Sequence, residues 1–192
     1  MRSYMRVIEG HAAALRRLAH VGPLDRVDPH LLSQEFNMAI VTLNDIQDLS
    51  NEDRRHLEAV DARTWSGVGI ALPDGRFLVI LHPRQTRERA AVTTMEEVAH
   101  SYLGHIPTKL IRQPNGLTTR QYDPGAEREA YWTAAATLLP SVVVAQAVWH
   151  GHEAETLAET YGVSKELVEF RIKTLHLWHE YKANADRSKK AG

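Results

Sequence analysis

The chain has 192 residues, enough to bury a hydrophobic core in one compact body. Its formal net charge of -1 at pH 7 excludes a global field that would attract nucleic acid or an anionic membrane, so such a partner would need a local basic patch. The absence of cysteine excludes disulfides, thiolate zinc ligands and cysteine nucleophiles together. A metal site in this chain would therefore consist of histidine and carboxylate ligands.

Neither a secretion signal nor a membrane span is indicated by the sequence. The N-terminal segment mixes charged and short apolar side chains and has no uninterrupted apolar core before a cleavage site. No apolar run approaches the roughly 18 residues of a membrane-spanning helix. We therefore expect a cytoplasmic protein without a membrane partner.

The N-terminal half predicts helices, one strand and a hairpin. Residues 66–72 and 76–81 are two apolar runs joined by Pro73, Asp74 and Gly75, which is typical hairpin chemistry. Before them, apolar periodicity and turn residues predict a helix over 5–20 that ends at Gly22 and Pro23, a short helix over 29–36, a strand over 38–43 and a helix over 46–57.

The C-terminal half is predicted to be almost entirely helical, which gives a mostly helical α+β fold with a small sheet. Residues 106–124, rich in proline and glycine, are expected to form mainly a loop. The expected helices run from Thr93 to about Leu103 before Gly104 and Pro107, from the Asp123–Pro124 cap to Pro140, and over 142–149, 152–161 and 164–178, followed by a frayed tail at 186–192.

The helix expected after Thr93 carries the clearest chemical pattern. Because each helical residue advances by about 100°, Glu96 and His100 share one face with Glu97 beside them. Met95, Val98, Ala99 and Tyr102 have the spacing of the opposite, core-facing side. Two ligands one turn apart on a helix suit a zinc ion that keeps an open position for water.

These five positions match the H-E-x-x-H motif except at the first. Glu97 and His100 occupy the positions of the general base and the second histidine, while Glu96 replaces the first histidine. A structural interpretation remains open, because Thr93 and Thr94 each precede a glutamate by three residues, as in a capping box. Acidic residues in a first helical turn are also favoured by the helix dipole.

Five segments, in order and spanning roughly residues 30–180, resemble the ImmA/IrrE family of metallo-endopeptidases. They are TMEEVAH at 94–100, LGH at 103–105, EREAY at 127–131, AAATLLP at 134–140 and VSKELVEFR at 163–171. The resemblance implies a zincin-like minimal peptidase fold in residues 1–140, a C-terminal helical subdomain in 141–184 and a flexible tail from 185 to 192. It also implies zinc, or Mn²⁺ or another divalent metal, as cofactor.

Carried over by position, the resemblance implies Glu97 as the general base and Glu96, His100 and Glu129 as metal ligands. Family members usually read H-E-x-x-H-x-x-L-G-H, so Glu96 departs from the pattern and places activity in question. For Glu129, the alternative is an exposed glutamate in the first turn of its helix. His105 is implied as a catalytic residue or fourth donor, with a helix-capping role as the equal alternative. Arg120 and Tyr122 are weaker candidates for stabilising an oxyanion.

Residues 156–164, with Gly162 and then Ser164 as N-cap, predict a helix-turn-helix-like unit. Residues 152–192 contain seven lysines or arginines and seven acidic residues, so no basic face for strong nucleic-acid binding is expected. The leading hypothesis is a regulatory zinc-dependent metallo-endopeptidase that cleaves a specific protein, by resemblance a transcriptional repressor. The alternative is a catalytically impaired or non-enzymatic relative that binds a protein partner.

Overall fold

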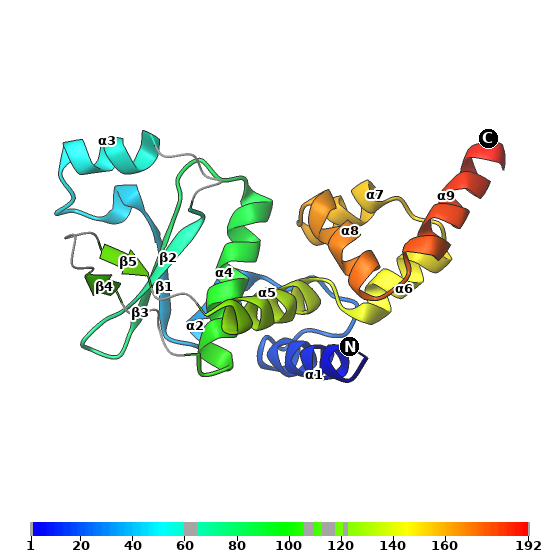
Figure 1. Cartoon of the computed structure of the whole chain (residues 1–192), viewed down its shortest axis with the longest axis horizontal. Coiled ribbons are helices and arrows are strands. Elements are labelled where there is room, and N and C mark those ends of the chain that lie inside the picture. Colours follow the sequence, from blue (N-terminus) through cyan, green and yellow to red (C-terminus); the bar gives the residue numbers. More distant parts are fainter. Residues whose placement is uncertain (1, 60–64, 106–109, 113–117, 121–122, 192) are drawn as a thin grey trace.

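The computed structural model describes the backbone of residues 2–59, 65–105, 110–112, 118–120 and 123–191, and the side chains of 3–59, 65–105 and 123–184. Figure 1 shows the sheet and α3 at one end, α4 and α5 in the middle and α6–α9 at the other end. The helices are α1 (Arg2–Leu18), α2 (Pro29–Gln34), α3 (Asn51–Ala59), α4 (Arg87–Tyr102), α5 (Pro124–Leu138), α6 (Ser141–Trp149), α7 (Ala154–Tyr161), α8 (Lys165–Thr174) and α9 (Trp178–Ala191).

The main sheet has three strands in the order β1-β3-β2, where β1 is Met38–Thr42, β2 is Gly67–Ala71 and β3 is Phe77–Leu81. β1 runs parallel to β3, and β2 pairs antiparallel with it through the predicted hairpin. Gly75 takes a φ of +83° in the turn, a conformation that glycine adopts without steric cost. The expected α+β fold with a small sheet is therefore confirmed.

The core lies where α4 and α5 meet between the sheet and α1. α4 buries Met95, Val98 and Ala99, as its apolar spacing predicts, and α5 buries Ala130, Ala134 and Ala135. Alanines let two helix backbones come close, so α4 and α5 pack along much of their length. α1 packs against the other side of α5, and α2 against α4.

The C-terminal helices follow α5 after Pro140. The turn between α7 and α8 has the predicted chemistry: Gly162 is left-handed with a φ of +64°, and the Ser164 side chain accepts a hydrogen bond from the Leu167 amide as the N-cap of α8. α6 packs against both α8 and α9. In Figure 1, α9 extends away from the rest of the molecule.

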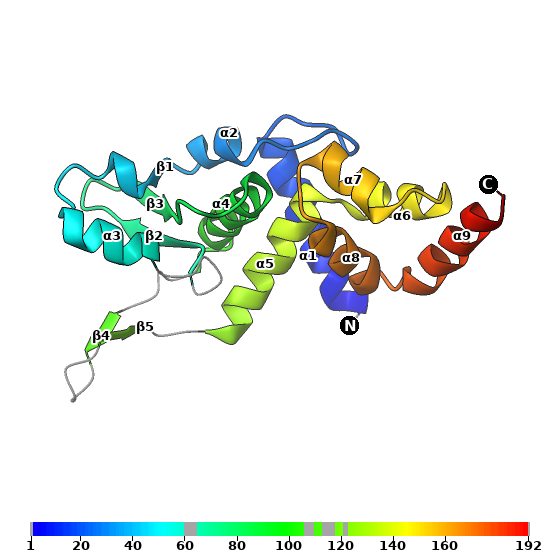
Figure 2. The same cartoon turned by 90° about the horizontal axis from the view of Figure 1, so that it is seen from above.

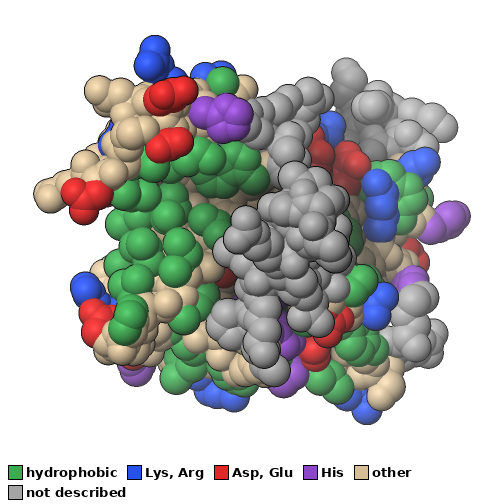
Figure 3. All heavy atoms as spheres, turned by 60° about the vertical axis from the view of Figure 1, so that its left-hand side comes forward, with side chains coloured by type: hydrophobic (Ala, Val, Ile, Leu, Met, Phe, Trp, Pro, Cys, Tyr) green, Lys and Arg blue, Asp and Glu red, His purple; other side chains and the backbone are tan. Residues whose placement is uncertain are grey.

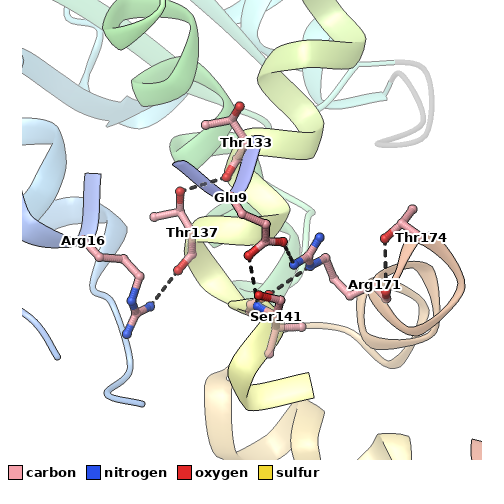
Figure 4. A network of polar contacts seen from close by, with 8 residues as sticks. Glu9, Arg16, Thr133, Thr137, Ser141, Arg171 and Thr174 are labelled. Carbon is pink, nitrogen blue, oxygen red and sulfur yellow. Dashed lines mark hydrogen bonds and ion pairs between the residues drawn. The ribbon is translucent and has the colours of Figure 1, made fainter. Parts of the chain in front are cut away.

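A buried polar network ties α1 to the C-terminal helices (Figure 4). The Arg171 side chain of α8 pairs with the Glu9 carboxylate, and its Nε donates a 2.9 Å hydrogen bond to the Leu139 carbonyl. Glu9 also accepts a 3.1 Å hydrogen bond from the Ser141 amide at the start of α6. Arg16 donates a 2.7 Å hydrogen bond to the Thr137 carbonyl near the end of α5. These contacts join α1, α5, α6 and α8 at one place.

The expected start of α4 is wrong by six residues. The helix begins at Arg87, and Thr86 is its N-cap because the Thr86 side chain accepts a hydrogen bond from the Arg89 amide. Thr93 and Thr94 are buried inside the helix. Glu96 and Glu97 therefore lie in the third turn, and the capping-box interpretation of these glutamates is also wrong.

Several other expected boundaries differ from those of the structure. Residues 106–124 contain a small antiparallel hairpin of β4 (Leu110–Arg112) and β5 (Thr118–Arg120), which Figure 2 shows projecting away from the main sheet. The helix expected over 164–178 divides at His176, which has a φ of +61°. A 3-10 turn, η1 (Leu43–Asp45), precedes α3, which begins at Asn51. Helix α2 ends at Gln34, and α9 continues to Ala191 where a frayed tail was expected.

The outer face of the sheet is apolar and partly covered. A groove of about 420 Å³ lies between Val68 and Ile80 of the sheet and the segment from Leu43 to Leu57. Figure 3 shows hydrophobic side chains gathered at this end of the molecule. No single helix within the described residues is long and apolar enough to cross a membrane; α5 and α6 reach that length only together, across a 57° bend.

Candidate functional site

Two glycines of β2 let α4 approach the sheet closely. Gly67 and Gly69 alternate along the strand and so share its inner face. A Cβ atom on Gly67 would lie 2.8 Å from Cγ2 of Thr93, and one on Gly69 would lie 2.6 Å from Oε2 of Glu97. The Glu97 carboxylate is thus held against the backbone of β2, where only glycine leaves room for it.

The C-terminal end of α4 brings His105 next to His100. Gly104 is left-handed with a φ of +68°, and the His105 amide donates a 3.0 Å hydrogen bond to the His100 carbonyl, which is the bond of a Schellman motif. The two Nδ1 atoms lie 3.0 Å apart, so one ring donates and the other accepts. The prediction that Gly104 ends the helix is confirmed.

Helix α5 places two carboxylates against these histidines. Its N-terminus is set as predicted, because the Asp123 side chain accepts hydrogen bonds from the amides of Gly125 and Ala126. Oε2 of Glu127 lies 3.6 Å from Nε2 of His100, and Oε2 of Glu129 lies 3.4 Å from Nε2 of His105. The described site is therefore a chain of four groups: Glu127, His100, His105 and Glu129.

Glu96 lies one turn before His100 on α4, and it is close enough to Glu127 of α5 for the two charges to interact. It lines an open cleft of about 580 Å³ together with Tyr131 of α5 and Leu167 of α8. Burial, followed by the charges of Glu97 and Glu127, raises the pKa of Glu96 to about 8. Burial and the charge of Glu96 likewise raise the pKa of the Tyr131 hydroxyl. In the metal-free protein Glu96 is thus mainly protonated at neutral pH, and it must lose that proton before it can bind a metal.

The structure brings together only part of the predicted ligand set. Glu129 contacts His105, and His105 in turn contacts His100. The carboxylate that contacts His100 directly is that of Glu127. Glu129 lies in the second turn of α5, so the alternative interpretation of Glu129 as a first-turn residue is wrong. The convergence of Glu96, His100 and Glu129 on one point stays a prediction.

The donor types suit a divalent metal, but no more than two of the donor atoms described above are placed to bind the same ion. Ligands of a tetrahedral zinc ion with bonds near 2.05 Å lie roughly 3.3 Å apart. Each histidine–carboxylate pair approaches this spacing through Nε2, yet the two pairs involve different histidines. Among the described residues, no three His, Asp or Glu side chains are positioned to hold one metal ion. A three-ligand site would require these side chains to reorient.

Two contributors to the site were missed in the sequence. Glu127 belongs to the same motif as Glu129, and it lies one turn before Tyr131, whose hydroxyl is close enough to Glu96 of α4 to feel its charge. Gly69 follows Gly67 at the spacing of one strand face, a signal of close backbone approach. Tyr122 and the Arg120 side chain lie outside the described part of the chain.

Comparison with known families identifies the domain that contains this site. A family model described as the IrrE N-terminal-like domain, peptidase family M78, matches residues 47–173. This interval runs from the segment just before α3 to the last turn of α8, and it includes Glu96, Glu97, His100, His105 and both carboxylates of α5. The resemblance inferred from the five sequence motifs is confirmed. A search among curated proteins finds no match to the chain.

Proposed function

Because the chain belongs to the peptidase M78 family of IrrE N-terminal-like domains, we propose that it is a metallo-endopeptidase that cleaves a specific protein. The observation that carries the proposal is the position of Glu97. Its carboxylate is held against β2 on the helix that carries His100, and its neighbour in sequence, Glu96, lines the 580 Å³ cleft. A carboxylate held in a fixed position on this helix suits a general base that accepts a proton from the attacking water.

The family implies a divalent metal, typically zinc, and our proposal keeps Glu96, His100 and Glu129 as its ligands. Glu127 is a further candidate because it lies beside His100. A bound metal would supply Lewis acidity to a peptide carbonyl. The contacts of His105 with both His100 and Glu129 favour an orienting or proton-holding role for this side chain.

The substrate and cellular setting belong to the same proposal. We propose a transcriptional repressor as the substrate, a cytoplasmic location and a regulatory role, as the family resemblance implies. No strong nucleic-acid binding is expected, because the charges of residues 152–192 balance.

A second candidate function has its own support in the site. No three donors converge among the described side chains, and the ligand position that is usually histidine carries a glutamate with a raised pKa. Both observations favour a non-enzymatic relative that binds a protein partner without cleaving it. The two functions differ in their need for a metal.

The experiment that separates the two functions is elemental analysis of protein purified without added metal, combined with a cleavage assay. The assay substrate is a repressor encoded beside this protein, and chelator treatment followed by return of Zn²⁺ or Mn²⁺ is the control. Bound metal with cleavage that is lost on chelation and restored by metal supports the peptidase. Protein that binds no metal and cleaves under no metal condition supports the non-enzymatic function.

A further inference from the structure

A hollow lined mainly by cationic and aromatic side chains lies where α8 meets α9. It has a volume of about 830 Å³ and is open to solvent. The residues around it are Lys173, His176, Trp178, His179, Lys182 and Ala183. This hollow is not apparent from sequence, because the total charge over residues 152–192 is balanced and the basic side chains gather only when the chain folds.

The break between α8 and α9 builds the hollow. His176 is left-handed, and the Leu177 amide donates a 2.9 Å hydrogen bond to the Ile172 carbonyl, so α9 starts sharply at Trp178. Nζ of Lys173 lies 4.4 Å from the centre of the Trp178 ring, and Nζ of Lys182 lies 5.5 Å from it. A cation is attracted to the face of an indole ring, so Trp178 gathers one lysine from each helix.

Positive charge prevails among the side chains that line the hollow. Two ammonium groups lie near one ring, and His176 and His179 beside them are exposed. Glu169 pairs with Lys173 at 3.3 Å but does not line the hollow. Two like charges over one ring repel each other, and an anion between them would relieve that repulsion.

We propose that this hollow binds an acidic segment of a protein partner. The carboxylates of such a segment would pair with Lys173 and Lys182, while its apolar side chains would contact Trp178. Interfaces use aromatic residues of this kind as anchors, and complementary charges direct the approach of the partner.

An acidic peptide fits the hollow better than nucleic acid does. Glu169 pairs with Lys173 at one side of the hollow, and a phosphate backbone that continued past Lys173 would meet this carboxylate. A peptide can present carboxylates singly and place a neutral or basic side chain opposite Glu169. The hollow lies on the C-terminal unit, separate from Glu97 and His100, so the binding does not depend on peptide cleavage.

The test uses the full chain and a fluorescein-labelled peptide of alternating Glu and Leu, with an alternating Lys and Leu peptide as its matched control. Fluorescence anisotropy should show salt-sensitive binding of the acidic peptide only. The double substitution Lys173→Gln with Lys182→Gln should weaken this binding about tenfold, since each exposed charge contact contributes modestly. Lys165→Gln, which removes a lysine at the other end of α8, should leave it unchanged.

The charge-reversed variant keeps the proposal testable if the neutral one loses little affinity. Lys173→Glu with Lys182→Glu should abolish acidic-peptide binding and create binding of the basic peptide, while circular dichroism reports an unchanged fold. The proposal is overturned if the acidic peptide does not bind, or if Lys165→Gln weakens binding as much as the double variant. It is also overturned if labelled duplex or single-stranded DNA binds the same lysines more tightly than the acidic peptide.

Discussion

Oε2 of Glu97 on α4 lies so close to Gly69 of β2 that a Cβ atom on Gly69 would be only 2.6 Å from it. The carboxylate therefore packs directly against the backbone of β2. The same imagined Cβ would lie 2.5 Å from the Phe77 ring of β3. Neither distance is compatible with a real side chain. The position of the proposed general base therefore depends on a residue of the sheet that carries no functional group.

Substitution of Gly69 by alanine should reduce cleavage. The added methyl must push away either Glu97 or Phe77, and overpacking of this kind typically costs about 1 to 3 kcal/mol of stability. We expect a lower kcat with a modest fall in Tm, measured by cleavage kinetics and thermal unfolding.

The matched control is Gly10→Ala, because nothing lies within 4 Å of a Cβ at Gly10 in the middle of α1. Replacing a helical glycine by alanine should raise stability by about 0.5 to 1 kcal/mol and leave cleavage unchanged. A Gly69→Ala protein with full activity would show that Glu97 is not held by this contact.

The substitution Glu97→Gln tests whether this side chain acts as a base. Glutamine keeps the size of the side chain but cannot accept the proton of water, so cleavage should fall by about 10²- to 10⁴-fold. Metal content and Tm should stay near wild type. Unchanged turnover would remove the catalytic role that we propose for Glu97.

The substitution His100→Ala tests metal binding instead of proton transfer. Loss of an imidazole ligand should lower both the metal content in elemental analysis and the cleavage rate. His30→Ala is the control, since His30 is an exposed histidine on α2. Equal metal content in the two variants would count against a metal site at the end of α4.

Metal-free protein should lose stability as pH rises, through Glu96. Its pKa is about 8 in the folded protein and near the ordinary 4.5 when unfolded, so the folded state binds a proton more tightly. This contribution to stability is fully present below pH 4.5 and is lost as pH rises through 8. In chelator, Tm should therefore fall more between pH 5 and pH 8 for wild type than for Glu96→Gln. A smaller fall in wild type than in Glu96→Gln would contradict a protonated Glu96.

The ion pair between Glu9 and Arg171 should be important for stability. Arg171 is 1% exposed, and burial lowers its pKa while the charge of Glu9 opposes that shift. Glu9→Gln would leave a buried cation without its partner, at a cost of about 3 kcal/mol in thermal or denaturant unfolding. Glu155→Gln, which breaks an exposed pair with Lys165, should change Tm little. Equal Tm values for the two variants would contradict a stabilising role for the buried pair.

The parts of the fold that were predictable from sequence depend on residues close together in the chain. The caps at Asp123 and Ser164 and the left-handed turns at Gly104 and Gly162 each involve a hydrogen bond across two to five residues. The start of α4 is hidden in the sequence because Thr93 and Thr94 each precede a glutamate by three residues, whereas Thr86, the actual N-cap, precedes Arg89. Burial of Thr93 and Thr94 in the packed core decides between these positions.

The pairing within the site was less predictable for a geometric reason. Glu127 and Glu129 are two residues apart, so their side chains leave α5 in directions about 200° apart. Which of them faces His100 depends on the rotation of α5 about its axis, and that is set by packing against α1 and α4. The residue types of the site can be identified from sequence, whereas helix packing determines which glutamate pairs with which histidine.

The contact between α1 and α8 also has a consequence for protein synthesis. Arg171 is made 162 residues after Glu9, a delay of about 10 to 30 s at ribosomal rates of about 5 to 20 residues per second. Until then the nascent α1 lacks the cation that faces its carboxylate, although the Ser141 amide that binds the same carboxylate is made earlier. The contact between α1 and α8 therefore forms late in synthesis, after α1, the main sheet, α4 and α5 have been made.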